Sequence, residues 1–97
     1  MLLILSDIPL RTAPFSLADQ WLIWTELRLY ADRLELSGWG VRGRYWRCLP
    51  FEEIETVDHE RDRLLLSLTG SRVLPIHMNH PRRWHTAIEP HRSVYER

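Results

Sequence analysis

Apolar and polar residues alternate with a period of two through the middle of the chain. Leu27 and Leu29 are flanked by polar or charged residues, and after a short connection at 31–33 Leu34 and Leu36 follow the same rule. Successive side chains of a strand point to opposite faces of a sheet, so both runs predict half-buried strands. The short connection predicts that the two strands pair as a β-hairpin.

Three closely spaced glycines follow this hairpin and predict another reversal of the chain. They are Gly38, Gly40 and Gly43, and the next alternating run covers 44–49 and stops at Pro50. Glycine favours tight turns because it lacks a Cβ atom, whereas proline ends a ladder because it lacks an amide donor. The pattern therefore predicts a third strand, and the three strands form a meander of hairpins.

A second period-two region follows a fully charged turn at 60–63. The even-numbered leucines of 64–69 share one face, and Gly70-Ser71 then predicts a two-residue turn of the primed type. The last strand is predicted over 72–77. Pro75 cannot donate to a ladder, so we expect this strand to lie at a sheet edge or to be bulged there.

The two ends of the chain have different patterns. The apolar segment 2–5 predicts a strand, 8–14 predicts an extended connection, and Ser16 predicts one helical turn over 17–20. At the other end Pro81 marks the start of a helix. Its inward stripe would consist of Trp84, Ala87 and Ile88, and Pro90 predicts that the helix is short and interrupted.

The segment Pro50–Val57 reads Pro-aromatic-acidic-acidic-Ile-x-x-Val and stands before the second hairpin. This motif and the order of the predicted elements resemble bacterial pleckstrin-homology-like (PH-like) and GRAM-like domains. The resemblance covers about residues 25–89 and implies a mainly β fold: a bent antiparallel barrel of about seven strands with a short C-terminal helix. We expect one domain over 1–97, with its core at about 21–89 and a strand and extended connection in 1–20.

The amino-acid composition indicates which kind of partner the protein binds and in which cellular compartment it is expected. Thirteen basic and thirteen acidic residues cancel, so the formal net charge is zero, and this balance argues against nucleic acid as a partner. The single Cys48 excludes an intramolecular disulfide and favours a cytoplasmic location. The apolar segment 1–5 is too short for a signal peptide or a membrane span, so no transmembrane segment is predicted.

Candidate catalytic and metal-binding residues are few. His77, His80 and His85 lie close together in the sequence, but zinc needs three or four converging donors, and no cysteine or His-Glu-x-x-His pattern supports a site. Surface and capping histidines are the preferred interpretation. Cys48 lies in a strand beside Trp46, and no nucleophile elbow is present, so we expect no enzyme activity and no cofactor.

The segment 39–47 combines arginine with aromatic residues around a glycine turn. Arginine forks bind phosphate or carboxylate groups, and PH domains bind lipid headgroups with basic residues on an early hairpin loop. The resemblance therefore makes this hairpin the place where a ligand is expected. The candidate ligand-binding residues are Arg42, Arg44, Trp46 and Arg47. The alternative is a structural hairpin in which these arginines stack on Tyr45 and Trp46 and pair with nearby glutamates.

These observations predict a non-catalytic, PH-like binding or assembly module that acts through protein–protein contacts and self-associates. Unpaired strand edges and a high tryptophan content favour this function. The expected form is a two-fold homodimer, whose candidate interface residues are Leu2, Leu3, Ile4 and Leu5. The alternative function is binding of an anionic lipid headgroup or peptide through the Arg42/Arg44/Arg47 hairpin.

Overall fold

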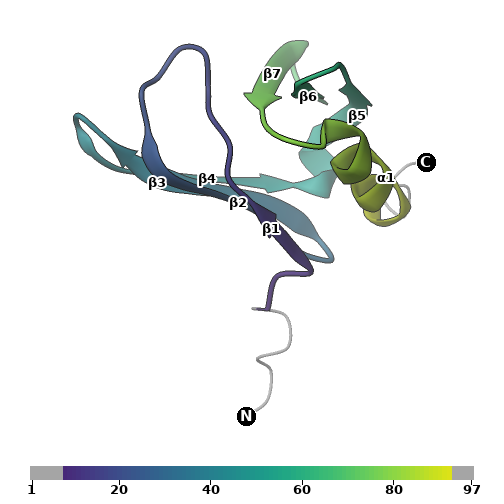
Figure 1. Cartoon of the computed structure of the whole chain (residues 1–97). Helices are drawn as coiled ribbons and strands as arrows, with labels where there is room; N and C mark the ends of the chain where they lie inside the picture. Colours follow the sequence, from purple (N-terminus) through teal and green to yellow (C-terminus); the bar gives the residue numbers. More distant parts are fainter. Residues whose placement is uncertain (1–7, 93–97) are drawn as a thin grey trace.

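The computed structural model describes residues 8–92 and shows a mainly β protein with two antiparallel sheets and one C-terminal helix (Figure 1). The first sheet contains, in spatial order, β1 (Arg11–Ala13), β2 (Ile23–Leu29), β3 (Arg33–Gly40) and β4 (Gly43–Pro50). The second contains β5 (Ile54–His59), β6 (Arg63–Leu68) and β7 (Arg72–His77). The helix α1 spans Pro81–Arg92.

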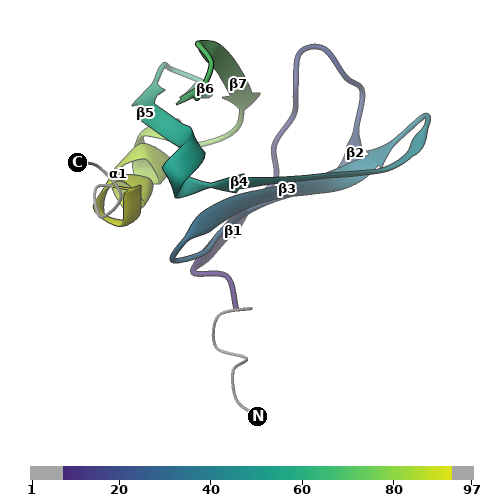
Figure 2. The same ribbon diagram turned by 180° about the vertical axis from the view of Figure 1, so that it is seen from behind.

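The two sheets are joined at one end by a single 3-10 turn, η2 (Phe51–Glu53). Figure 2 shows β4 running into this turn and on into β5. On the other side, Ser16 and His77 exchange two backbone hydrogen bonds of 2.8 and 2.9 Å, which tie the β1–β2 loop to β7. No strand of one sheet pairs with a strand of the other within 8–92, so the closed barrel implied by the resemblance is not formed there.

Most predicted strands are confirmed. Leu27 pairs with Leu36 and Leu29 with Leu34, as expected for the first hairpin. β7 lies at the edge of the second sheet, in agreement with the missing amide donor of Pro75. The alternation therefore located the strands because one face of each sheet is buried against the other sheet and the helix.

The predicted two-residue turn at Gly70-Ser71 is not formed, because Leu68 pairs with Arg72 and the loop therefore has three residues, 69–71. Gly70 and Ser71 both have positive φ, 90° and 64°, a conformation that glycine adopts without steric cost. This loop joins β6 and β7 in one continuous register. That register pairs Leu66 with Leu74 and Leu68 with Arg72.

Three further local predictions need correction. The segment 8–14 is not only an extended connection, because β1 lies within it and pairs with β2. The expected helical turn over 17–20 is absent, and Leu17 instead bridges Gln20 across a tight turn. The helix continues through Pro90 to Arg92, and the Arg92 side chain donates a hydrogen bond to the second sheet. The predicted strand over 2–5 lies outside the described residues.

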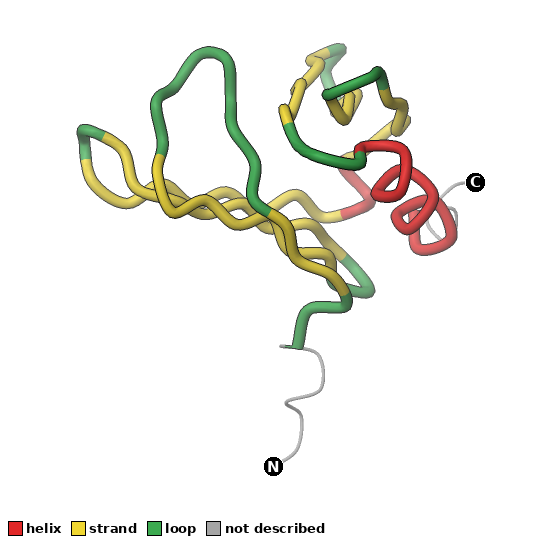
Figure 3. The backbone as a smooth tube through the Cα atoms, in the orientation of Figure 1, coloured by secondary structure: helices red, strands yellow, loops and turns green. Residues whose placement is uncertain are grey.

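The core lies between the two sheets and against α1. Fully buried leucines come from both sheets, among them Leu36 and Leu66, and the helix contributes Trp84 and Ile88. These positions match the predicted period of two in the strands and the inward stripe of the helix. The tube in Figure 3 shows the helix lying beside the second sheet, where it packs on β5 and β6. The core therefore leaves the opposite face of the first sheet uncovered within 8–92.

Candidate functional site

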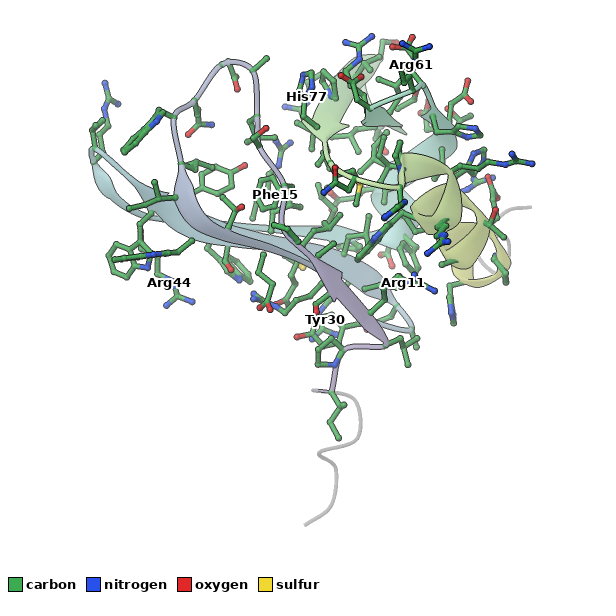
Figure 4. The ribbon with its side chains drawn as sticks, in the orientation of Figure 1. Arg11, Phe15, Tyr30, Arg44, Arg61 and His77 are labelled. Carbon is green, nitrogen blue, oxygen red and sulfur yellow. The ribbon has the colours of Figure 1, made fainter. Side chains whose placement is uncertain are left out.

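The first sheet has an inner face toward the core and an outer face turned away from it. Along β4 the pairing register places Arg47 opposite the buried Leu36, but Arg44 opposite the exposed Trp39. Paired residues share a face, so Arg47 belongs to the inner face and Arg44 to the outer face. Figure 4 shows Arg44 on the side of the sheet away from β5–β7. The structure therefore does not bring Arg44 and Arg47 together.

The outer face carries an aromatic patch, which we define as Trp39, Arg44 and Trp46. Trp39 is 48% exposed and Trp46 is 53% exposed. Trp39 pairs with Arg44 and Ser37 pairs with Trp46, so the two indoles are diagonal neighbours on adjacent strands. Large exposed aromatic side chains beside arginine are typical of protein interfaces, in which tryptophan and arginine carry much of the binding energy.

The other half of the outer face is an ion-pair network. The Nη2 atom of Arg28 lies 3.4 Å from a Glu35 oxygen, and Arg33 Nε donates to the other Glu35 oxygen at 2.7 Å. Arg33 also lies over the Tyr30 ring, 4.0 Å from its centroid. The hydrogen bond to Glu35 raises the pKa of Arg33 above its usual value. These cations are engaged within the chain and are poor candidates for binding a partner.

Arg42 and Arg44 differ from that network. No hydrogen bond, ion pair or ring contact joins either side chain to another residue of the described range 8–92. Arg42 lies in the two-residue turn between β3 and β4, and Arg44 is on the patch. The structural alternative, in which the hairpin arginines pair with nearby glutamates, is therefore not seen for these two residues.

A hollow lies at the end of this hairpin. It has a cavity volume of about 430 Å³ and is lined by residues 19–22 on one side and 40–45 on the other. Trp21, 69% exposed, and Val41, 88% exposed, form apolar parts of its rim. Both Arg42 and Arg44 line the hollow, so this end of the molecule offers cations next to exposed apolar surface.

The outer edge of β4 is the longest unpaired strand edge of the described residues. β4 has eight residues and, within residues 8–92, pairs only with β3, so its other side presents backbone donors and acceptors that no described strand satisfies. Trp46 lies at the middle of this edge and Pro50 ends it. An unpaired edge bearing an exposed indole is suited to strand addition by another chain.

Within the described residues, the three histidines that were weighed as metal ligands do not form one group. His77 lies in β7 and pairs through its backbone with Ser16, and His80 precedes the helix with a φ of 60°. His85 instead meets His59, whose Nδ1 atom lies 2.7 Å from the Nδ1 atom of His85. Sequence reasoning missed His59 because it is 26 positions away and carries no motif.

Cys48 lies on the outer face in β4 and is half-buried. Burial, followed by the nearby Glu35 carboxylate, raises the pKa of its thiol. The thiolate is the nucleophilic form, so this environment disfavours reactivity near neutral pH. The side chain therefore has the environment of a structural thiol.

Comparison with protein-family models, curated proteins and solved structures gave no match. No helix of the described residues is both long and apolar enough to cross a membrane. The predicted interface residues Leu2, Leu3, Ile4 and Leu5 lie outside the described range.

Proposed function

We propose that this chain is a non-catalytic, PH-like assembly module that forms a two-fold homodimer through the β4 edge. The PH-like assignment is supported by the sequence motif at Pro50–Val57 and by the arrangement of a four-stranded sheet, a three-stranded sheet and a C-terminal helix. The single observation that carries the dimer is Trp46, an exposed indole at the middle of an unpaired edge strand.

The geometry of an antiparallel pair limits the registers of such a dimer. Only residues of the same face can stand opposite each other, so outer-face positions must meet outer-face positions. If Trp46 faces Trp46 of the second copy, then Arg44 faces Cys48 and Tyr45 faces Arg47. This register pairs Gly43 to Leu49 completely and leaves Pro50, which lacks an amide donor, outside the ladder.

The composition of the edge favours a second copy as its occupant. In this register each Tyr45 ring meets an arginine of the second copy on the inner face, and aromatic rings attract guanidinium groups. On the outer face the two Trp46 indoles meet at the two-fold axis, where aromatic pairs add about 1 kcal/mol beyond area burial. The chain has zero formal net charge, so two copies meet without net repulsion.

The oligomeric state tests this function directly. We expect the wild-type protein to sediment as a dimer at micromolar concentration and Trp46→Glu to weaken the dimer at least about 30-fold, because a hot-spot indole is replaced by like charges at the axis. Trp24→Glu is the matched control: it removes an exposed indole from β2, two strands away from the β4 edge, and should leave the dimer intact. A monomeric wild type at high micromolar concentration would overturn the proposal.

A cross-linking experiment tests the register separately. Arg44→Cys places a thiol opposite Cys48 of the second copy, and paired Cα atoms of antiparallel strands lie within disulfide range. We expect covalent dimers under mild oxidation. Arg44→Cys with Cys48→Ser should form far fewer, because the two new thiols are then not opposite each other. Equal dimer yields from both variants would contradict the register.

A second candidate function is binding to an anionic membrane surface, favoured by the hollow at the hairpin end. Arg42 and Arg44 line it without partners in the described residues, and Trp21 and Val41 expose apolar surface beside them. Indole rings prefer the membrane–water interface, and arginine is attracted to anionic headgroups. Arg47 is not among the residues that line the hollow and is left out of this site.

Vesicle co-sedimentation tests the second candidate. We expect binding to vesicles that contain phosphatidylserine, weakening with salt, and little binding to phosphatidylcholine alone. Arg42→Gln with Arg44→Gln should abolish it, whereas the control Arg61→Gln with Arg72→Gln removes the same charge from exposed positions elsewhere and should not. Salt-independent binding, or equal loss in both double variants, would reject this function.

A further inference from the structure

We propose that Asp58, His59 and His85 form a binding site for a divalent metal ion of the zinc class. One ligand atom from each residue lies within 4.8 Å of the other two. Asp58 and His59 come from the end of β5, and His85 comes from α1, so the ion would join the second sheet to the helix. This inference is independent of the proposed dimer, whose residues lie on the first sheet.

The backbone explains how two consecutive residues serve one site. Neighbouring side chains of a strand normally point to opposite faces. Here His59 is the last residue of β5, and the Oδ1 atom of Asp58 accepts a hydrogen bond of 2.8 Å from the His59 backbone N–H. The Asp58 carboxylate is thereby turned back toward the chain that follows it. This turn brings it to the side of the strand on which His59 meets His85.

The two imidazoles face each other through the atoms that bind metals. Their Nδ1 atoms are 2.7 Å apart, and the rings meet edge to face with an interplanar angle of 61°. Two lone pairs at this distance repel, so the pair needs a shared proton or a cation between them. Zinc–nitrogen bonds of about 2.0–2.1 Å at a tetrahedral angle require a separation of about 3.3 Å. A small opening of these two half-buried side chains provides it.

Glu89 orients His85 for this role. Its Oε2 atom lies 3.4 Å from Nε2 of His85, and its other oxygen accepts a hydrogen bond of 3.1 Å from Arg92. A carboxylate at Nε2 favours the tautomer that carries its proton there, which leaves the Nδ1 lone pair directed at His59. This carboxylate–histidine arrangement is the usual second layer of a zinc site.

The donor set identifies the class of ion. Two imidazole nitrogens and one carboxylate suit Zn²⁺, Co²⁺ or Ni²⁺, whereas Ca²⁺ and Mg²⁺ prefer oxygen ligands throughout. Three protein ligands leave a fourth tetrahedral position for water. The hollow beside His59 and His85 is also lined by Arg82, whose positive charge repels any cation. Binding therefore depends on the bonds to the two imidazoles, and we expect metals that prefer nitrogen ligands to be selected.

Calorimetric titration of the untagged protein with Zn²⁺ tests the site. We expect one equivalent to bind, with no comparable binding of Ca²⁺, and the thermal midpoint to rise because only the folded chain assembles the three ligands. Co²⁺ should give the visible absorption of a tetrahedral site with nitrogen ligands. Less than one equivalent of Zn²⁺ would overturn the proposal and leave a hydrogen-bonded histidine pair.

Single substitutions test which side chains bind the metal ion. His59→Ala and His85→Ala should each abolish binding, and Glu89→Gln should weaken it by about 10–100-fold while the metal-free fold persists. His80→Ala is the matched control, because His80 is a surface histidine outside the group of three. If His80→Ala weakens binding as much as His85→Ala does, the metal binds to surface histidines and the proposal fails. Circular dichroism of each variant separates loss of binding from loss of fold.

Discussion

The guanidinium of Arg92 donates a hydrogen bond of 2.8 Å from Nη1 to the carbonyl oxygen of Glu55, which is 37 positions away in the sequence. Arg92 is the last residue of α1 and is only 8% exposed. The bond fixes the last described turn of the helix to β5. The contact holds the part of the helix that follows Pro90 against the second sheet.

Replacing this side chain should destabilise the protein. We expect Arg92→Ala to lower the free energy of unfolding by about 2 kcal/mol, since a charge-assisted hydrogen bond and buried aliphatic contacts are lost together. Arg83→Ala on the exposed face of the same helix is the control and should change it by less than about 0.5 kcal/mol. Urea denaturation of both variants measures the difference. Equal effects would mean that the Glu55 contact does not secure the helix.

Two substitutions in the turn between β6 and β7 should change the free energy of unfolding in opposite directions. Gly70 has a φ of 90°, and no atom lies within 4 Å of where its Cβ would be, so Gly70→Ala carries a backbone cost alone. We expect a loss of about 1–2 kcal/mol. Ser71→Gly should instead be neutral or slightly stabilising, because Ser71 has a φ of 64°, and glycine adopts this conformation without the steric strain that a Cβ atom causes. Thermal unfolding measures both, and stabilisation by Gly70→Ala would contradict the turn.

The centre of the core should be sensitive to truncation. Leu66 is fully buried on the middle strand of the second sheet. Leu66→Ala should therefore lower the free energy of unfolding by about 2–5 kcal/mol, through lost burial and the cavity that remains. Val73→Ala on the neighbouring strand is the control, because Val73 is 60% exposed and should cost little. Chemical denaturation compares the two variants, and a loss below 1 kcal/mol for Leu66→Ala would argue against this core.

The thiol of Cys48 should titrate above its ordinary range. Burial raises its pKa, so at any pH below that value the folded chain holds a smaller thiolate fraction than the unfolded chain. Because the thiolate is the reactive form, alkylation by iodoacetamide should be slower in the folded protein, and its rate should level off at a higher pH. The urea-unfolded protein is the reference. A midpoint at or below that of the unfolded chain would show that the thiol is not desolvated.

The candidate site was only partly accessible from the sequence. The separation of Arg44 and Arg47 follows from strand parity, because residues three apart in a regular strand lie on opposite faces. The His59–His85 pair had no such signal, since it joins a strand to a helix across the fold. The aromatic patch was visible as composition, but its exposure depends on which face of the sheet the second sheet covers.

The local periodicity of the sequence by itself determined the strands of both hairpins, the chain reversal at Gly70-Ser71 and the buried stripe of α1. Each of these depends on residues a few positions apart, whose alternation reports the backbone conformation directly. Only the tertiary structure decided that the sheets remain unclosed within 8–92, that β1 pairs with β2, and that His59 meets His85. Contacts between distant segments depend on how the sheets and the helix pack, and no local pattern records that choice.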